Sequence, residues 1–204
     1  MASNPVERFN LSERAFHWLA ALSFVYAGLS GLALFSHKLY WLASIFGGGE
    51  ATRWSHPWAG LIFSVALGFM FLRWAGQMRL DADDREWLRN SDKYAKHEES
   101  GLPEAGRFNG GQKMLFWVEA LCCLLLLATG LVLWFPEATP RGLRLAAVLI
   151  HPVAAIVAIT GIIVHIYMGT LAIPGALRSM TRGWATEGWA AAHHPKWYRE
   201  ISKR

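Results

Sequence analysis

Apolar residues along the chain gather into four long segments that contain almost no charge. The charged residues within them are Arg73, near the end of the second segment, and Glu119 in the third. Each segment has about the 20 apolar residues that an α-helix needs to cross a bilayer. The pattern therefore predicts four membrane-spanning helices, over residues 15–36, 54–74, 114–135 and 145–172.

The composition agrees with this pattern. Of 204 residues, 53% are hydrophobic and 17% are charged. So small a charged fraction excludes a disordered chain and is unusual for a soluble domain. We therefore predict a single domain over residues 1–204, with the fold of an all-α integral membrane four-helix bundle.

Basic residues predict the orientation of this bundle. Sixteen Lys and Arg lie in the N-terminal arm, the second loop and the C-terminal tail, against four in the other two loops. By the positive-inside rule, both termini and the long loop between the second and third helices are cytoplasmic. A short interfacial helix is expected in the tail. A nucleic-acid partner is excluded, because acidic residues are interleaved with the basic ones in the second loop.

Four histidines lie within or at the edges of the apolar segments, where a polar ring is costly and usually has a task. They are His17, His56, His151 and His165. His151 and His165 are separated by about 21 Å of helical rise and by about 40° less than four full turns, so they share one face at opposite depths. Depth then pairs His56 with His151 near the outer side, and His17 with His165 near the cytoplasmic side.

Two imidazoles that face each other across a helix bundle are the ligands that a b-type haem iron requires. Small residues near the histidines would make room for the porphyrin discs. The alternative is that these residues only allow close helix packing, as they often do in membrane bundles. Four depth-matched histidines favour two haem b groups. The small residues are Gly28, Gly31, Gly60, Ala155, Gly161 and Gly169.

The tandem of His193 and His194 in the tail is interpreted differently. A metal site is one use for adjacent histidines. Their position in a polar tail instead favours a solvent-exposed or interfacial role, and we expect neither of them to bind haem.

Short motifs extend this interpretation. The first helix opens with the pattern Asn-x-x-Glu-Arg-x-x-His-Trp, and the most specific strings are GRFNGGQK and HHPKWYRE. With these motifs the chain resembles the cytochrome b subunit, or gamma subunit, of membrane-bound formate dehydrogenases over almost its whole length. The motifs occupy residues 10–18, 55–60, 106–113 and 193–200.

The resemblance implies a subunit of a respiratory chain. His17, His56, His151 and His165 would ligate two b haems in the pairs reached above. Electrons would come from an iron–sulfur beta subunit with a membrane helix, which receives them from a molybdopterin alpha subunit that uses Mo or W. Formate would be oxidised there, not by this chain alone. The acceptor would be menaquinone or ubiquinone in the inner membrane of a bacterium.

The resemblance also places the quinone at Asn109, Gly111 and Gln112, near the inner haem. The residue types agree, because the two amides can donate to a quinone carbonyl and glycine permits close approach. Glu119 follows on nearly the same helical face as a candidate proton relay. A structural alternative stays open for each part of this site: Asn109 to Gly111 would merely cap the helix, and Glu119 would pair with a basic side chain.

Two other functions are weighed. One is the cytochrome b subunit of a nickel–iron hydrogenase or of another molybdopterin or iron–sulfur oxidoreductase, which a neighbouring gene for the catalytic subunit would identify. The other is a haem-free anchor that only docks a catalytic subunit to the membrane. The anchor predicts that His56→Ala and His165→Ala leave colour and activity unchanged.

Overall fold

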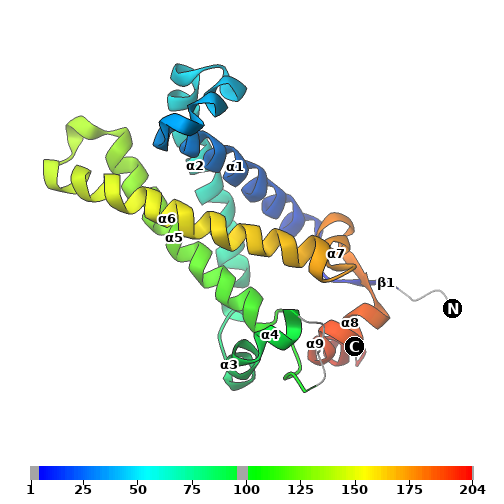
Figure 1. Ribbon diagram of the computed structural model, residues 1–204. Coiled ribbons are helices and arrows are strands. Elements are labelled where there is room, and N and C mark those ends of the chain that lie inside the picture. The colour runs from blue at the N-terminus through cyan, green and yellow to red at the C-terminus, as the bar shows by residue number, and fades with distance from the viewer. Residues whose placement is uncertain (1–4, 96–100, 204) are drawn as a thin grey trace. The chain divides into compact units, whose positions relative to one another are not determined.

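Four long helices dominate the computed structural model, which describes residues 5–95 and 101–203 (Figure 1). All four are long and apolar enough to cross a membrane. This confirms the predicted all-α fold. The long helices are α1 (Leu11–Phe35), α2 (Gly49–Trp74), α5 (Gly110–Trp134) and α6 (Arg141–Tyr167). The shorter elements are β1 (Pro5–Glu7), η1 (His37–Phe46), η2 (Ala75–Gln77), α3 (Ala82–Arg89), α4 (Ser91–Ala95), η3 (Pro136–Ala138), the π-helical η4 (Met168–Ala172), α7 (Ala176–Arg182), β2 (Trp184–Thr186), α8 (Glu187–His193) and α9 (Pro195–Ile201).

Polar caps start α1 and α5 ahead of the apolar stretches. The Glu13 backbone N–H donates to Asn10 Oδ1 at 2.9 Å, and the Asn10 N–H donates to Glu13 Oε2 at 2.9 Å. Asn109 and Gln112 form the same reciprocal pair at α5, at 2.9 and 3.0 Å. Such a capping box satisfies backbone N–H groups that have no partner within the helix. Both helices therefore begin four residues before the predicted membrane segments.

One compact unit of the chain, here called the bundle unit, comprises Ala15–Leu72 and Glu119–Ile162. Within it each long helix contacts two others, so the four helices close into a bundle. The contacts are Phe24 with Phe63 between α1 and α2, Trp58 with Trp134 between α2 and α5, and Thr129 with His151 between α5 and α6. Between α6 and α1, a Cβ added to Gly28 would lie 3.9 Å from Ile159 Cδ1.

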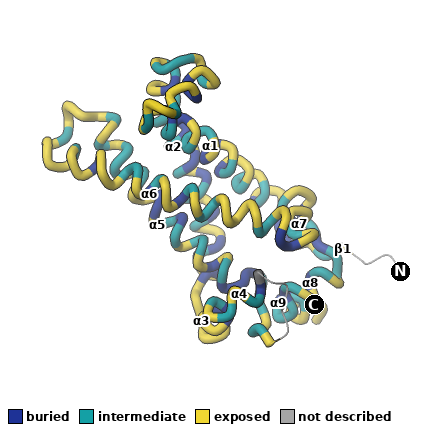
Figure 2. The backbone as a smooth tube through the Cα atoms, viewed as in Figure 1, coloured by how far each residue is buried: buried dark blue, intermediate teal, exposed yellow. Residues whose placement is uncertain are grey.

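Much of each long helix is exposed (yellow in Figure 2), and many of the exposed residues are large and apolar. Only 17–28% of the most apolar stretch of each span is buried. Leu72 and Leu149, for example, are 85% and 70% exposed. Apolar surface on this scale is covered by lipid or by partner proteins, because its exposure to water is unfavourable in free energy. The faces are therefore suited to a bilayer.

The second compact unit, here called the terminal unit, comprises the described parts of Met1–Arg14, Arg73–Val118 and Ile163–Arg204. In it, β1 pairs antiparallel with β2, with Val6 opposite Ala185. This pairing ties the N-terminal arm to the tail. A small apolar core lies beside η4 and consists of Trp87, Tyr94, Ala172 and Ile173.

The tail carries three short helices, α7 to α9, where the sequence predicted one. Gly183 ends α7 with a φ of 90°, a left-handed conformation that favours glycine. Pro195 begins α9, a position where its fixed φ and missing N–H are tolerated. These two residues break the tail into separate helices.

His194 corrects the sequence analysis, because it is 1% exposed rather than at the surface. Its Nδ1 donates to the Gly106 carbonyl oxygen at 2.7 Å, and its Nε2 accepts from Arg8 Nη2 at 2.8 Å. Burial and then the charge of Arg8 hold the pKa of His194 well below its ordinary value. The neutral ring therefore joins the N-terminal arm to the loop before α5, which is a structural role.

Candidate haem and quinone sites

His56 of α2 and His151 of α6 face each other within the bundle unit. Their ring centroids are 6.3 Å apart, and the ring planes are inclined by 71°. A metal–imidazole bond is about 2 Å long and a ring nitrogen lies about 1 Å from the ring centre, so two imidazoles on opposite sides of one iron have centroids about 6 Å apart. The structure thus brings together the pair predicted from depth, at a spacing that suits one iron.

A cavity of about 500 Å³ adjoins both rings. This is within the range of about 300–1,000 Å³ that small-molecule and cofactor sites occupy. Gly60 lines the cavity, and a Cβ there would meet no atom within 4 Å. Arg53 is the one Lys, Arg, Asp or Glu among the described residues of the lining, and it offers a partner to carboxylates. Facing imidazoles, apolar walls and a cation for the propionates fit a haem b.

The other two histidines belong to different units of the chain. His17 lies on α1 in the bundle unit, where it is half-buried with its ring 5.4 Å from the ring of Trp18. His165 lies near the end of α6 in the terminal unit. Their pairing as ligands of a second haem stays a prediction.

The residues predicted to bind quinone form the first turn of α5. The side-chain oxygens of Asn109 and Gln112 accept the two capping bonds, so each offers its amide nitrogen as the group for another partner. A Cβ on Gly111 would lie 3.0 Å from Trp87 Cζ3. This glycine therefore lets α5 pack against α3. Capping by Asn109 is confirmed, with Gln112 as its partner, and quinone binding by the amide nitrogens stays a prediction.

Glu119 is buried in α5 with 6% of its surface exposed. Its Oε1 has no hydrogen-bond partner, and no basic side chain forms an ion pair with it, within the described parts of the chain. The alternative in which Glu119 pairs with a basic residue is therefore not realised there. A buried polar atom without a partner is costly, and such groups in membrane helices usually have a function.

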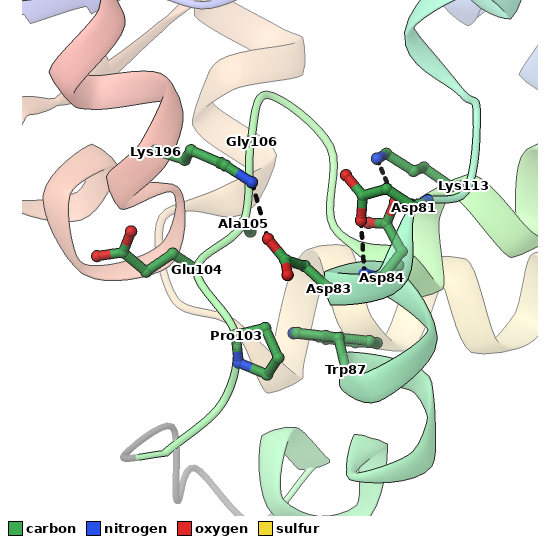
Figure 3. A pocket seen from close by; sticks show the side chains of 11 residues that line it. Asp81, Asp83, Asp84, Trp87, Pro103, Glu104, Ala105, Gly106, Lys113 and Lys196 are labelled. Carbon is green, nitrogen blue, oxygen red and sulfur yellow. Dashed lines mark hydrogen bonds and ion pairs between the residues drawn. The ribbon is translucent and has the colours of Figure 1, made fainter.

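Two ion pairs, from aspartates of α3 to lysines of α5 and α9, line a small cavity that was not predicted from the sequence (Figure 3). Lys113 Nζ lies 2.5 Å from Asp84 Oδ2, and Lys196 Nζ lies 2.9 Å from Asp83 Oδ2. A hydrogen bond from the Asp84 backbone lowers the pKa of Asp81, which caps α3. At about 60 Å³ the cavity holds water-sized groups only. The pattern Asp-x-x-Asp before a helix was the available signal for this cap.

Known proteins similar to this chain are cytochrome b subunits. A family model described as prokaryotic cytochrome b561 matches residues 8–183. The chain is 36% identical to the cytochrome b556(Fdn) subunit of the nitrate-inducible formate dehydrogenase of Escherichia coli K12, covering 98% of this chain and 94% of that protein. Identity to the cytochrome b556(fdo) subunit of the same strain is 35%, covering 97% and 94%. For the cytochrome b556 subunit of formate dehydrogenase from Haemophilus influenzae it is 33%, covering 95% and 82%.

Proposed function

Because the chain belongs to the prokaryotic cytochrome b561 family, we propose that it is the di-haem cytochrome b subunit of a membrane-bound formate dehydrogenase. The main observation that supports this proposal is that His56 and His151 face each other beside an apolar cavity. The choice of complex is supported by similarity to formate dehydrogenase subunits over nearly the full length. Its direct test is the number and type of haems that the purified chain holds.

The four membrane histidines would hold the two haems. His56 and His151 would ligate one, and His17 and His165 the other. Haem iron, when bound, supplies a one-electron carrier. The chain supplies the rest: the bundle fixes the spacing of the imidazoles, the apolar walls exclude water, and Arg53 at the cavity would pair with the propionates.

Quinone reduction is placed at the start of α5. The amide nitrogens of Asn109 and Gln112 would donate to a quinone carbonyl, with Gly111 beside them, and Glu119 would pass protons from the cytoplasmic side. Two electrons and two protons convert the quinone to a quinol. The charge distribution of the loops predicts that the start of α5 is cytoplasmic, so if electrons enter from the outer side, turnover separates charge across the membrane.

The proposed partners follow from the same complex. An iron–sulfur beta subunit with a membrane helix would deliver electrons, and a molybdopterin alpha subunit would oxidise formate. This chain would oxidise no formate alone. As a multi-pass membrane protein it would lie in the bacterial inner membrane, with both termini on the cytoplasmic side.

Replacing Glu119 by glutamine keeps the shape of the side chain and removes the carboxyl group that can release and take up a proton. We expect quinone to oxidise the reduced haems about a hundredfold more slowly, or more, at unchanged haem content, because general acid catalysis contributes a factor of about 10²–10⁴. Stopped-flow absorbance of the haem bands measures this rate. Glu137→Gln, at an exposed glutamate in η3, is the matched control. A wild-type rate in Glu119→Gln would remove Glu119 from the proton path.

A further inference from the structure

The ring of His56 is held from α1 by a serine and a glycine. Ser30 Oγ lies 3.0 Å from His56 Nδ1. The same hydroxyl donates its single proton to the Tyr26 carbonyl oxygen at 2.7 Å. With its proton on that carbonyl, Ser30 Oγ is placed to accept from Nδ1–H of the His56 ring, and in this arrangement Nε2 is the deprotonated nitrogen. A Cβ on Gly31 would lie 3.1 Å from His56 Cε1, so the glycine allows the ring to approach α1 this closely.

The ring of His151 is held in the same way from α5. Thr129 Oγ1 lies 2.8 Å from His151 Nδ1 and donates its proton to the Leu125 carbonyl oxygen at 2.5 Å. With its proton on that carbonyl, Thr129 Oγ1 is likewise placed to accept from Nδ1–H of His151, an arrangement in which Nε2 is again the deprotonated nitrogen. A Cβ on Gly130 would touch the ring at 3.4 Å from Cε1.

The surroundings of His56 and His151, here called the two half-sites, are built alike although they come from different segments of the sequence. In each, a histidine followed by proline faces a hydroxyl residue followed by glycine on the neighbouring helix. Back-bonding of a hydroxyl to its own helix is common and by itself means little. Here it has a consequence, because a hydroxyl whose proton lies on a helix carbonyl can only accept from the ring, which favours the tautomer with hydrogen on Nδ1. Repetition at both half-sites indicates a built feature.

We propose that Ser30 and Thr129 are positioning residues that hold His56 and His151 in the Nδ1–H tautomer, with Nε2 as the nitrogen that binds iron. The inference rests on the proposed function, because it assigns a role toward the haem. Outer-shell acceptors of this kind orient a ligating histidine and raise its basicity. A more basic imidazole favours the ferric state. Both hydroxyls therefore lower the reduction potential of the haem between these histidines.

The test compares hydroxyl-free and hydroxyl-retaining variants of the full chain. Thr129→Val keeps the shape and removes the acceptor, whereas Thr129→Ser keeps the acceptor; Ser30→Ala and Ser30→Thr are the corresponding pair. Thr160→Val is the control, since Thr160 is exposed and back-bonds to a carbonyl of α6. Haem content is measured by the pyridine haemochrome assay, and midpoint potentials by redox titration of the visible bands.

We expect Thr129→Val and Ser30→Ala each to raise the potential of one haem, shifting its reduction equilibrium about threefold to tenfold toward the ferrous form. Thr129→Ser, Ser30→Thr and Thr160→Val should keep wild-type potentials. If Thr129→Val instead loses one haem, retention of that haem at its wild-type potential in Thr129→Ser supports the inference.

Two full haems with unchanged potentials in Thr129→Val and Ser30→Ala would overturn the inference. So would a Thr129→Ser variant that shifts as far as Thr129→Val, or that loses the same haem. These outcomes leave the proposed function intact. A wild-type chain that folds and holds no haem would refute the proposed function itself, which separates the two failures.

Discussion

Replacing His151 by alanine is expected to remove one of two haems and to stop electron transfer to quinone. The two imidazoles are spaced for one iron, so loss of either leaves a single ligand. His56→Ala should therefore give the same product, one haem per chain. Quinone reduction should fall by more than the roughly 10- to 100-fold that loss of an outer-shell partner costs. Haemochrome assays and haem-to-quinone kinetics measure both effects.

His37→Ala is the matched control for these variants. His37 is exposed at the start of η1, outside the cavity between His56 and His151. The His37→Ala variant should keep both haems and the wild-type rate of quinone reduction. Retention of two b-type haems by either His56→Ala or His151→Ala would show that this pair does not ligate iron.

Replacing Glu13 by alanine is expected to have the largest effect on the stability of the terminal unit. Glu13 is 3% exposed and accepts from Trp74 Nε1 at 2.7 Å, from Arg107 Nη2 at 3.0 Å and from the Asn10 N–H. Alanine would leave the Trp74 indole N–H without its acceptor and the Arg107 guanidinium without its carboxylate partner. Breaking a buried pair costs about 3–5 kcal/mol, and the partial exposure of Arg107 favours the lower end.

Denaturant unfolding of the purified chain in detergent measures this change in free energy. Glu13→Gln keeps an acceptor and should lose less than Glu13→Ala. Glu104→Ala is the control, because Glu104 forms an exposed ion pair with Arg199, and exposed pairs add little to stability. Equal free energies of unfolding for Glu13→Ala and Glu104→Ala would show that the buried pair stabilises the chain no more than the exposed pair does.

The long helices and one histidine pair follow from the sequence for a simple physical reason. A bilayer forces its spans to be long and apolar, so hydropathy finds them. Helical rise then converts sequence position into depth, which is enough to match His56 with His151. Hydropathy does not find the first residues of α1 and α5, because the capping pairs that start these helices lie in polar sequence outside the apolar stretches.

Contacts between distant parts of the chain lay beyond this reasoning. The sequence around Thr129 shows only a polar residue in an apolar helix, and its contact with His151 arises because α6 packs beside α5. Likewise, nothing local to the tail indicates that His194 is buried, because its partner Arg8 lies 186 residues away. Periodicity gives the face and depth of a residue on its own helix, but not the side chain it meets on another element.

The segment 106–113 shows how one motif serves two purposes. Sequence reasoning connected Asn109, Gly111 and Gln112 with quinone, and the structure gives each a local task in capping α5 or packing it against α3. Capping uses the amide oxygens and leaves the amide nitrogens as donors. The two roles are compatible because they use different atoms.

The most direct measurement is the haem content of the purified wild-type chain. Reduced-minus-oxidised spectra identify the haem type, and the pyridine haemochrome assay gives the number per chain. The account predicts two b-type haems, since four histidines of the membrane helices are assigned as ligands. A folded chain that holds none would contradict the account and favour a haem-free anchor. A single haem would refute one of the two histidine pairs.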